Sequence, residues 1–256
     1  MRLLSIFCTV AAVIISATPL SAQTLLKGAV PYFPVEQMPD MTKWLPAPPA
    51  FDSKAFSYDI SQYEWGKERR KDAARAAMAI SHASIDPVDI CSHFNEAFGM
   101  EITPEKTPHI FRLLIDGMET ANNITIKPKK EYKRTRPFTY FNQRTLVPDK
   151  EDVLRNNGSY PSGHTVIGTT AALLLSEINP AAADKLIKIG YECGQSRVIS
   201  GYHWQSDVDA SRFATSVALA KMHTSKRFVK QLKKARQEFK RLCRHSTAST
   251  AHPSNP

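Results

Sequence analysis

The chain has 256 residues, 42% of them hydrophobic, and a formal net charge of +10 at pH 7. This length suits a single domain with a sizeable core. We find no internal repeat, and only the N-terminal segment is continuously apolar, which excludes a repeat array and a multi-span membrane protein.

The first 22 residues are predicted to be a secretory signal peptide. Arg2 supplies the positive charge, Leu3 to Ala17 is almost wholly apolar, and Leu20-Ser21-Ala22 ends on a small residue before Gln23. The apolar run is short for a transmembrane anchor, the alternative interpretation. Cleavage would leave 33 Lys and Arg against 24 Asp and Glu, a formal charge of about +9.

Residues 23–53 are rich in proline and are predicted to form an extended arm over the surface of the protein. A disordered arm is the alternative. Residues 54–244 are then expected to form one helical domain, and residues 245–256 a disordered tail.

Helix-forming composition and capping signals predict a series of helices within the domain. Pro128 forbids an uninterrupted helix, so a new helix is expected to include it in its first turn. A polar loop is expected over Phe138 to Asn156. Strand-like alternation is missing, so the fold class is predicted to be all-α, a bundle with its site at one end. The expected helices are Trp65 to Ser84, Asp86 to Phe98, Thr107 to Asn122, Lys129 to Arg134, Ser162 to Ile178, Pro180 to Gly194 and Asp207 to His223.

Thr224 to Arg244 is predicted to be a basic amphipathic helix. Its narrow apolar stripe favours docking on the domain over a membrane or nucleic-acid role. The predicted stripe consists of Phe228, Val229, Leu232, Ala235, Phe239 and Leu242.

Three cysteines remain after the signal, Cys91, Cys193 and Cys243, so at most one internal disulfide can form. No Cys-x-x-Cys or other metal-ligand spacing is present, and we expect neither a metal nor a cofactor.

Three stretches of the sequence carry candidate chemistry, and we take the most C-terminal one first. It contains Arg197, His203 and Asp207, with the histidine and the aspartate four residues apart. On a helix this spacing lets the carboxylate reach one imidazole nitrogen and leaves the other free as a nucleophile. Asp207 is expected to raise the pKa of His203. Arg197 offers a planar set of donors for an anion. A core histidine beside a solvated charge pair is the alternative.

The second stretch is Gly158-Ser159-Tyr160-Pro161-Ser162-Gly163-His164-Thr165. Ser162 is expected to cap the following helix, whose free N–H groups form an anion site beside His164. The first stretch contains Lys129 and Arg136-Pro137. Lys129 and Arg136 are seven residues apart, so on a continuous helix both would point the same way.

Together these stretches read Lys-x6-Arg-Pro, Pro-Ser-Gly-His and Ser-Arg-x5-His-x3-Asp. This signature resembles that of the type 2 phosphatidic acid phosphatase superfamily, which includes vanadium haloperoxidases. The flanks from about Leu45 to about Phe239 resemble the bacterial class A non-specific acid phosphatases. The resemblance implies a helical bundle and a homo-oligomer in the periplasm of a Gram-negative bacterium. Cysteines that relatives often carry near the positions of Leu146 and Ser200 are absent.

The resemblance also implies hydrolysis of small phosphate monoesters without a metal. His203, oriented by Asp207, would form a phosphohistidine, and His164 would act as general acid and then base. Substrate phosphate would be bound by Lys129, Arg136, Ser162, Gly163 and Arg197. Nucleotide-cleaving apyrases and phosphotransferases of the family are alternatives. A vanadate-dependent haloperoxidase and a non-catalytic anion-binding protein remain further alternatives, whereas partnership with nucleic acid or a membrane is not expected.

Overall fold

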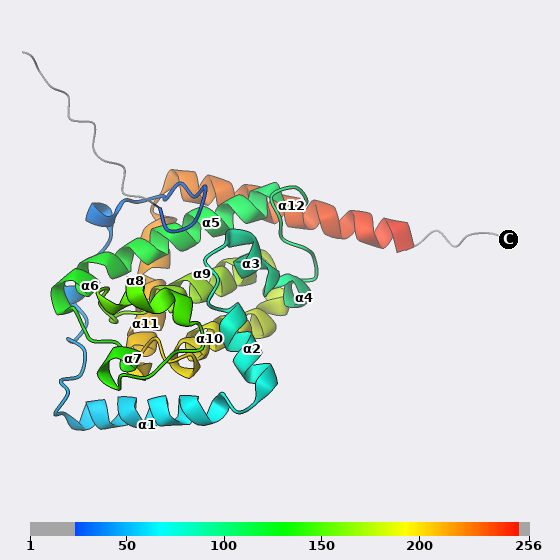
Figure 1. The fold of residues 1–256 in the computed structure, drawn as a ribbon. Helices are drawn as coiled ribbons and strands as arrows, with labels where there is room; N and C mark the ends of the chain where they lie inside the picture. The colour runs from blue at the N-terminus through cyan, green and yellow to red at the C-terminus, as the bar shows by residue number, and fades with distance from the viewer. Residues whose placement is uncertain (1–23, 251–256) are drawn as a thin grey trace, which may run out of the picture.

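The computed structural model describes residues 24–250, and side chains for residues 24–244; the predicted signal peptide and residues 251–256 lie outside this range. Helices account for nearly all its regular structure, and residues 24–250 contain no strand, which confirms the all-α prediction (Figure 1). The α-helices are α1 (Lys54–Arg69), α2 (Ala73–Ser81), α3 (Pro87–Ser92), α4 (Asn95–Phe98), α5 (Pro108–Asn122), α6 (Ile126–Tyr132), α7 (Pro137–Tyr140), α8 (Glu151–Arg155), α9 (Gly163–Ile178), α10 (Ala183–Ile199), α11 (Gln205–His223) and α12 (Lys226–Thr250).

The centre of the bundle is the close pair α9 and α10. Gly168 of α9 has no side chain, and a Cβ there would lie 2.5 Å from the Cβ of Cys193 on α10. Gly190 of α10 makes the reciprocal approach, because its Cβ would lie 2.6 Å from that of Ala172. These contacts forbid larger residues, so the two backbones pack directly against each other. This pairing matters for the site, since α9 begins at the His164 motif and α10 ends at Arg197.

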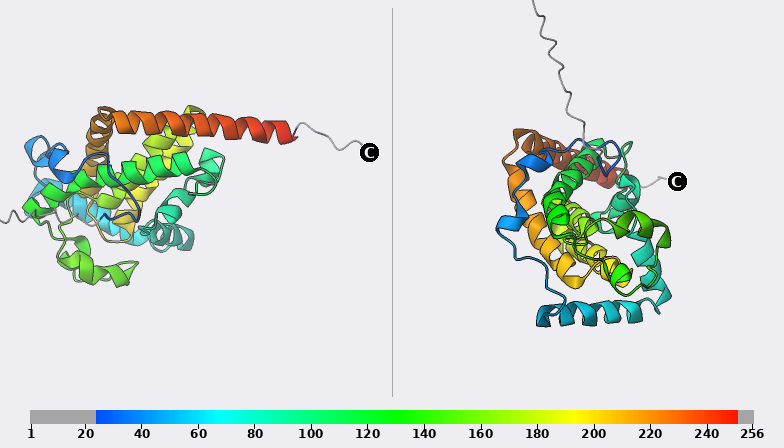
Figure 2. Two further views of the ribbon diagram at one scale, coloured as in Figure 1. Left: turned by 90° about the horizontal axis from the view of Figure 1, so that it is seen from above. Right: turned by 60° about the vertical axis from the view of Figure 1, so that its left-hand side comes forward.

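Helices α5, α11 and α12 pack around α9 and complete the main core. Phe228, Leu232 and Ala235 of α12 are buried, so this basic helix docks on the domain by its apolar face. Val229 is 47% exposed, and its assignment to the apolar stripe was therefore wrong. The helix also continues to Thr250, past Arg244 where we expected a disordered tail to begin, and it projects from the body of the domain (Figure 2).

Residues 24–32 run along α5 and are held by its polar side chains, and the segment then passes α6 and descends to the start of α1 (Figure 1). The backbone N–H groups of Leu25 and Leu26 donate to the Glu119 carboxylate at 3.0 and 2.9 Å. The Val30 N–H donates to Asp116 at 2.8 Å. Because each N–H gains an acceptor and Leu26 is fully buried, the arm is anchored to the bundle.

Two further helix predictions were wrong. Trp65 to Ser84 is divided between α1 and α2, because the Asp72 carboxylate caps a new helix by accepting from the N–H groups of Ala74 and Arg75. The expected loop over Phe138 to Asn156 includes most of α7 and all of α8. Short helices of this kind lack the periodicity by which longer ones are recognised.

Cys91 and Cys193 are buried thiols that do not form a disulfide. Burial raises the pKa of each to about 12, so both stay protonated.

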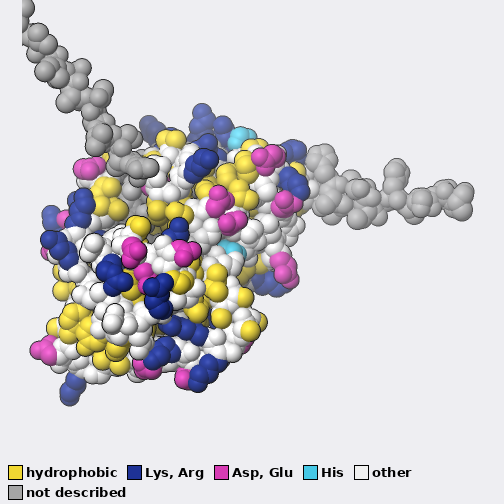
Figure 3. All heavy atoms as spheres, viewed as in Figure 1, with side chains coloured by type: hydrophobic (Ala, Val, Ile, Leu, Met, Phe, Trp, Pro, Cys, Tyr) yellow, Lys and Arg dark blue, Asp and Glu magenta, His cyan; other side chains and the backbone are white. Residues whose placement is uncertain are grey.

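Basic, acidic and apolar side chains are interspersed on the face shown in Figure 3. Within the described range, no helix is both long enough and apolar enough to span a bilayer.

Candidate active site

A pocket of about 620 Å³ opens where the N-terminus of α9 meets α6 and the end of α10. Six of the eight predicted site residues line it: Lys129, Arg136, Gly163, His164, Arg197 and His203. Asp207 and Ser162 are fully buried and are not among the lining residues. Tertiary packing thus gathers side chains from three distant stretches of the sequence at one cavity.

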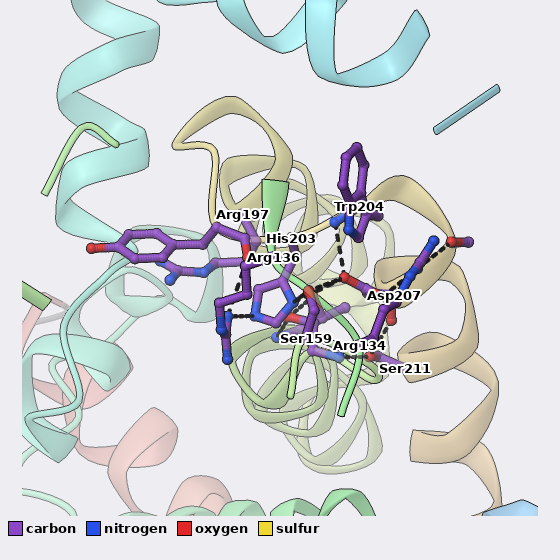
Figure 4. Close-up of polar contacts among 12 residues, drawn as sticks. Arg134, Arg136, Ser159, Arg197, His203, Trp204, Asp207 and Ser211 are labelled. Carbon is purple, nitrogen blue, oxygen red and sulfur yellow. Dashed lines mark hydrogen bonds and ion pairs between the residues drawn. The ribbon is translucent and has the colours of Figure 1, made fainter. Parts of the chain in front are cut away.

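His203 is held by its contacts with Asp207 and Ser159 (Figure 4). The imidazole Nδ1 lies 3.3 Å from Asp207 Oδ2 and 3.3 Å from Ser159 Oγ. The carboxylate accepts only, so the proton of neutral His203 belongs on Nδ1 and the lone pair on Nε2. His203 precedes α11, and Asp207 also accepts from the Trp204 N–H at 2.9 Å, which fixes the carboxylate in the first turn.

Behind Asp207 lies a buried charge network. Arg134 donates to Asp207 Oδ1 at 2.6 Å and to Asp59 Oδ2 at 2.7 Å. The Arg134 side chain is 3% exposed and both carboxylates are 0% exposed. Asp59 in turn accepts from the backbone and the hydroxyl of Ser206. One guanidinium therefore connects α1 to α11 and holds the carboxylate that orients His203.

Two of the cations also organise the polypeptide around the pocket. Lys129 Nζ donates to the Gly158 carbonyl at 2.9 Å. Arg136 Nε donates to the carbonyls of Leu154 and Asn157, and its Nη1 lies 3.0 Å from His203 Nε2. The contact between Arg136 Nη1 and His203 Nε2 places a donor on the lone pair of His203. An incoming anion would compete with His203 for this guanidinium.

The expected helical alignment of Lys129 and Arg136 was wrong, although both line the pocket. Helix α6 ends at Tyr132, and Lys133 has a left-handed φ of 43°. Arg136 follows in extended backbone as the residue before α7. The predicted break near Pro128 does occur, since a 3-10 turn over Asn123–Thr125 separates α5 from α6.

Arg197 is the most informative of the three cations. Its side chain lies 4.6 Å above the Tyr202 ring and the residue is 1% exposed. Its Nε and Nη1 atoms have no hydrogen-bond partner among the described residues. A buried guanidinium with unpaired donors at a pocket wall costs free energy unless water or an anion binds it. Arg197 is therefore a candidate anion-binding residue.

The N-terminus of α9 forms another wall of the pocket. Ser162 is the residue before the helix, and its hydroxyl accepts from the N–H and the hydroxyl of Thr165 at 3.3 and 2.8 Å. Ser162 thus caps α9 as predicted, one residue behind the lining of the pocket. Gly163 and His164 do line it, and N–H groups in a first helical turn have no earlier helix carbonyl to bond.

His164 is oriented from outside the pocket. Its Nε2 lies 3.2 Å from the carbonyl oxygen of Ala83, which can only accept a hydrogen bond. Nε2 therefore carries a proton, and Nδ1 is the nitrogen left for chemistry in the pocket.

The pocket is strongly electropositive, and this depresses the pKa values of its bases. Burial and Arg136 lower the pKa of His203 well below its usual value, despite the opposing effect of Asp207. Asp207 does raise the pKa as expected, but desolvation and Arg136 outweigh this one carboxylate, so the net shift is downward. Burial, Arg197 and His203 likewise lower the pKa of His164. These shifts favour the neutral form of both histidines.

Burial also lowers the pKa values of the cations, to about 10 for Arg136 and Arg197, which remain charged. Burial and Arg136 lower the pKa of Lys129 well below its usual value. Burial raises the pKa of Asp207, but Arg134, His203 and Ser159 lower it by more. The net shift is downward, and the carboxylate stays ionised.

Sequence reasoning missed Ser159, Arg134 and Asp59. Ser159 and Arg134 lie inside the recognised motifs, so their positions were already marked. Asp59 lies 75 residues before Arg134 in helix α1, and no spacing rule connects the two. Among residues 24–244, no group of three or more His, Cys, Asp or Glu side chains could hold a metal ion.

Comparison with known proteins gives consistent matches. A family model described as the PAP2 superfamily matches residues 113–230. The non-specific acid phosphatase of Providencia stuartii is 42% identical over 245 residues, which cover 94% of this chain and 98% of that protein. The non-specific acid phosphatase of Salmonella typhimurium is 41% identical over 82% of this chain and 84% of its own length. The acid phosphatase of Zymomonas mobilis is 29% identical over 79% of this chain and 76% of its own.

Proposed function

Since this chain belongs to the class A-type bacterial non-specific acid phosphatases of the PAP2 superfamily, we propose that it hydrolyses phosphate monoesters through a phosphohistidine at His203. The observation that carries the mechanism is the buried Arg197 with two unpaired nitrogens, in one pocket with His164 and His203. A pocket that only bound anions would need the cation, but not two histidines with separately fixed tautomers.

In the first step, the Nε2 lone pair of His203 attacks phosphorus and the ester P–O bond breaks. The His203 Nδ1–H remains hydrogen-bonded to the Asp207 carboxylate, which stabilises the imidazole as it gains positive character. Arg136 leaves Nε2 and turns to a phosphate oxygen as the substrate enters. This exchange frees the nucleophile only when an anion is present.

His164 protonates the departing alkoxide from Nδ1 and becomes neutral. In the second step, a water molecule attacks the phosphohistidine, its proton passes to His164 and the P–N bond breaks. Phosphate leaves, and His203 regains its lone pair. His164 must therefore be protonated when it meets the ester. A bound phosphate dianion supplies this condition, because a neighbouring anion raises the pKa that Arg197 and burial lower.

The remaining groups stabilise charge on the three equatorial oxygens of the transferring phosphoryl group. Lys129, Arg136 and Arg197 are the cations, and the amides of Gly163 and His164 are neutral donors. Three preorganised cations supply the charge that a metal ion supplies in other phosphoryl-transfer enzymes. We therefore propose that the reaction is independent of metals, and EDTA should leave the rate unchanged. If EDTA abolished hydrolysis and a divalent ion restored it, the proposal of metal independence would be contradicted.

The deciding experiment is to trap the phosphoenzyme. Rapid acid-free quenching with a ³²P-labelled monoester should label the wild type on histidine, whereas His203→Ala should neither label nor turn over while remaining folded. Residue Lys71, 73% exposed, provides a control, since Lys71→Ala should label normally. A normally active His203→Ala variant would refute the mechanism, and binding of phosphate without any label would favour an anion-binding protein.

We also propose that residues 1–22 direct export to the periplasm and are removed before Gln23, and that the mature enzyme is a homo-oligomer. N-terminal sequencing of protein from the periplasmic fraction tests the first proposal. Light scattering of the purified protein tests the second.

A further inference from the structure

The turn that follows α2 carries the carbonyl that orients the general acid. Ala83 lies two residues beyond the end of α2, and its oxygen accepts from His164 Nε2 at 3.2 Å. Any shift of this turn changes the direction of the His164 ring. The groups that hold the turn therefore bear on catalysis, although they do not enter the pocket.

His82, the residue before Ala83, is the anchor of this turn. Its Nδ1 lies 2.9 Å from the hydroxyl of Ser196 on α10. The same hydroxyl oxygen accepts from Arg75 Nη1 at 3.0 Å, and Arg75 Nη2 forms an ion pair with Glu192 at 3.0 Å. Ser196 is 0% exposed and the Arg75 side chain is 10% exposed, so the contacts are shielded from water.

These hydrogen bonds suit neutral His82. A guanidinium only donates, so the Ser196 oxygen accepts from Arg75, and its own proton is available to His82 Nδ1 when that nitrogen carries a lone pair. The backbone of Glu192, also on α10, opposes the lowering of the His82 pKa, so two residues of this helix act on the imidazole.

We propose that His82 is a positioning residue for the general acid: through Ser196 it fixes the Ala83 carbonyl, and that carbonyl sets the tautomer and direction of His164. The proposal rests on the proposed role of His164. It also connects both sides of the site, because Ser196 immediately precedes the anion-binding Arg197 on α10. His82 itself touches no reacting atom.

Protonation of His82 would weaken this anchor. Nδ1 would become a donor, the Ser196 hydroxyl would have to turn its proton away, and the new imidazolium would be repelled by Arg75. The charged and titratable groups around His82 are His93 from the end of α3, Arg75 from α2, and Glu192 and Arg197 from α10. Burial, His93 and Arg75 lower the pKa of His82 to about 4. We therefore expect the anchor to hold above about pH 4 and to weaken below it.

The test compares two esters in single-turnover measurements of the first step. An alkyl phosphate needs the proton from His164, whereas p-nitrophenyl phosphate has a good leaving group and depends on it little. General acid catalysis contributes about 10²–10⁴-fold, so misdirecting the ring should cost about 10-fold with the alkyl ester. Ser196→Ala and His82→Leu should show this loss and less than about 2-fold with the aryl ester.

His82→Asn is the conservative variant, since its amide oxygen can still accept from Ser196 but does not titrate. His82→Asn should hydrolyse the alkyl ester at close to the wild-type rate, unlike His82→Leu. Its rate with that ester should also lack the decline around pH 4 that is expected of the wild type. His109→Asn, on the exposed start of α5 and away from the pocket, is the matched control and should leave both esters unchanged. The free energy of unfolding of each variant in urea shows whether a lower rate reflects the site or a destabilised fold.

Equal losses with both esters in folded Ser196→Ala, or no rescue by His82→Asn, would overturn the positioning role. His164→Asn keeps the two hypotheses apart. If His164→Asn shows the large alkyl-specific loss and Ser196→Ala does not, the role of His82 fails alone. If His164→Asn shows no dependence on the leaving group, the general-acid assignment fails and the role of His82 fails with it.

Discussion

Replacing Arg134 by methionine should destabilise the protein severely. The substitution keeps much of the side-chain volume but removes the cation shared by Asp59 and Asp207, whose side chains are both 0% exposed. Their other contacts are hydrogen bonds from Ser206, Ser159, Trp204 and His203, all of which are neutral donors. Two buried carboxylates would thus lose their compensating charge.

Leaving a buried charge unpaired costs about 3–5 kcal/mol. That is a large part of the 5–15 kcal/mol by which native proteins are typically stable. For a domain of this size, it corresponds to a fall of roughly 6–20 °C in Tm. The free energy of unfolding should be measured in urea for Arg134→Met and for Arg69→Met. Arg69 is 47% exposed with a distant partner at 3.9 Å, so its loss should cost less than about 0.5 kcal/mol.

The pH dependence gives the second readout. Arg134 helps to hold the pKa of Asp207 below its ordinary value, so the stability from this carboxylate is present above about pH 4 and is lost as the pH falls through the lower folded value. Without Arg134 the pKa of Asp207 rises, so in the variant this carboxylate becomes protonated, and loses its unpaired charge, at a higher pH than in the wild type. The difference in unfolding free energy between the wild type and Arg134→Met should therefore shrink below about pH 4. A deficit under about 1 kcal/mol at pH 7, or one independent of pH, would refute the electrostatic account.

Three other outcomes are expected. Gly158→Ala should lower kcat/KM and Tm, because its Cβ would lie 2.5 Å from the Lys129 carbonyl oxygen; wild-type values for both would show that the backbones can separate. Vanadate should inhibit competitively and more tightly than phosphate, because a trigonal-bipyramidal adduct on His203 resembles the transition state, and unaffected hydrolysis at saturating vanadate would exclude that geometry. The kcat profile should fall at higher pH than that of kcat/KM, since bound phosphate raises the pKa of His164 that burial and Arg197 lower in the free enzyme; identical alkaline limits for the two parameters would contradict this.

The local sequence determined several helix ends and marked the residues of the candidate site. Ser162 caps α9, Asp86 caps α3 and Gly99 ends α4 with a φ of 86°, all at positions that short-range rules identify. His203 and Asp207 meet across one turn because four residues span it. These are contacts between neighbours in the chain, so spacing alone predicts them.

The tertiary structure decided how these residues are arranged and charged. Lys129 and Arg136 meet at the pocket although α6 ends between them, because each is tied to backbone carbonyls of residues 154–159. Asp59 reaches Arg134 only through the packing of α1 on the bundle. The sign of the pKa shift of His203 depends on burial and on Arg136, which spacing from Asp207 does not reveal. Desolvation and long-range pairing are properties of packed surfaces, and they exist only once the helices have been assembled.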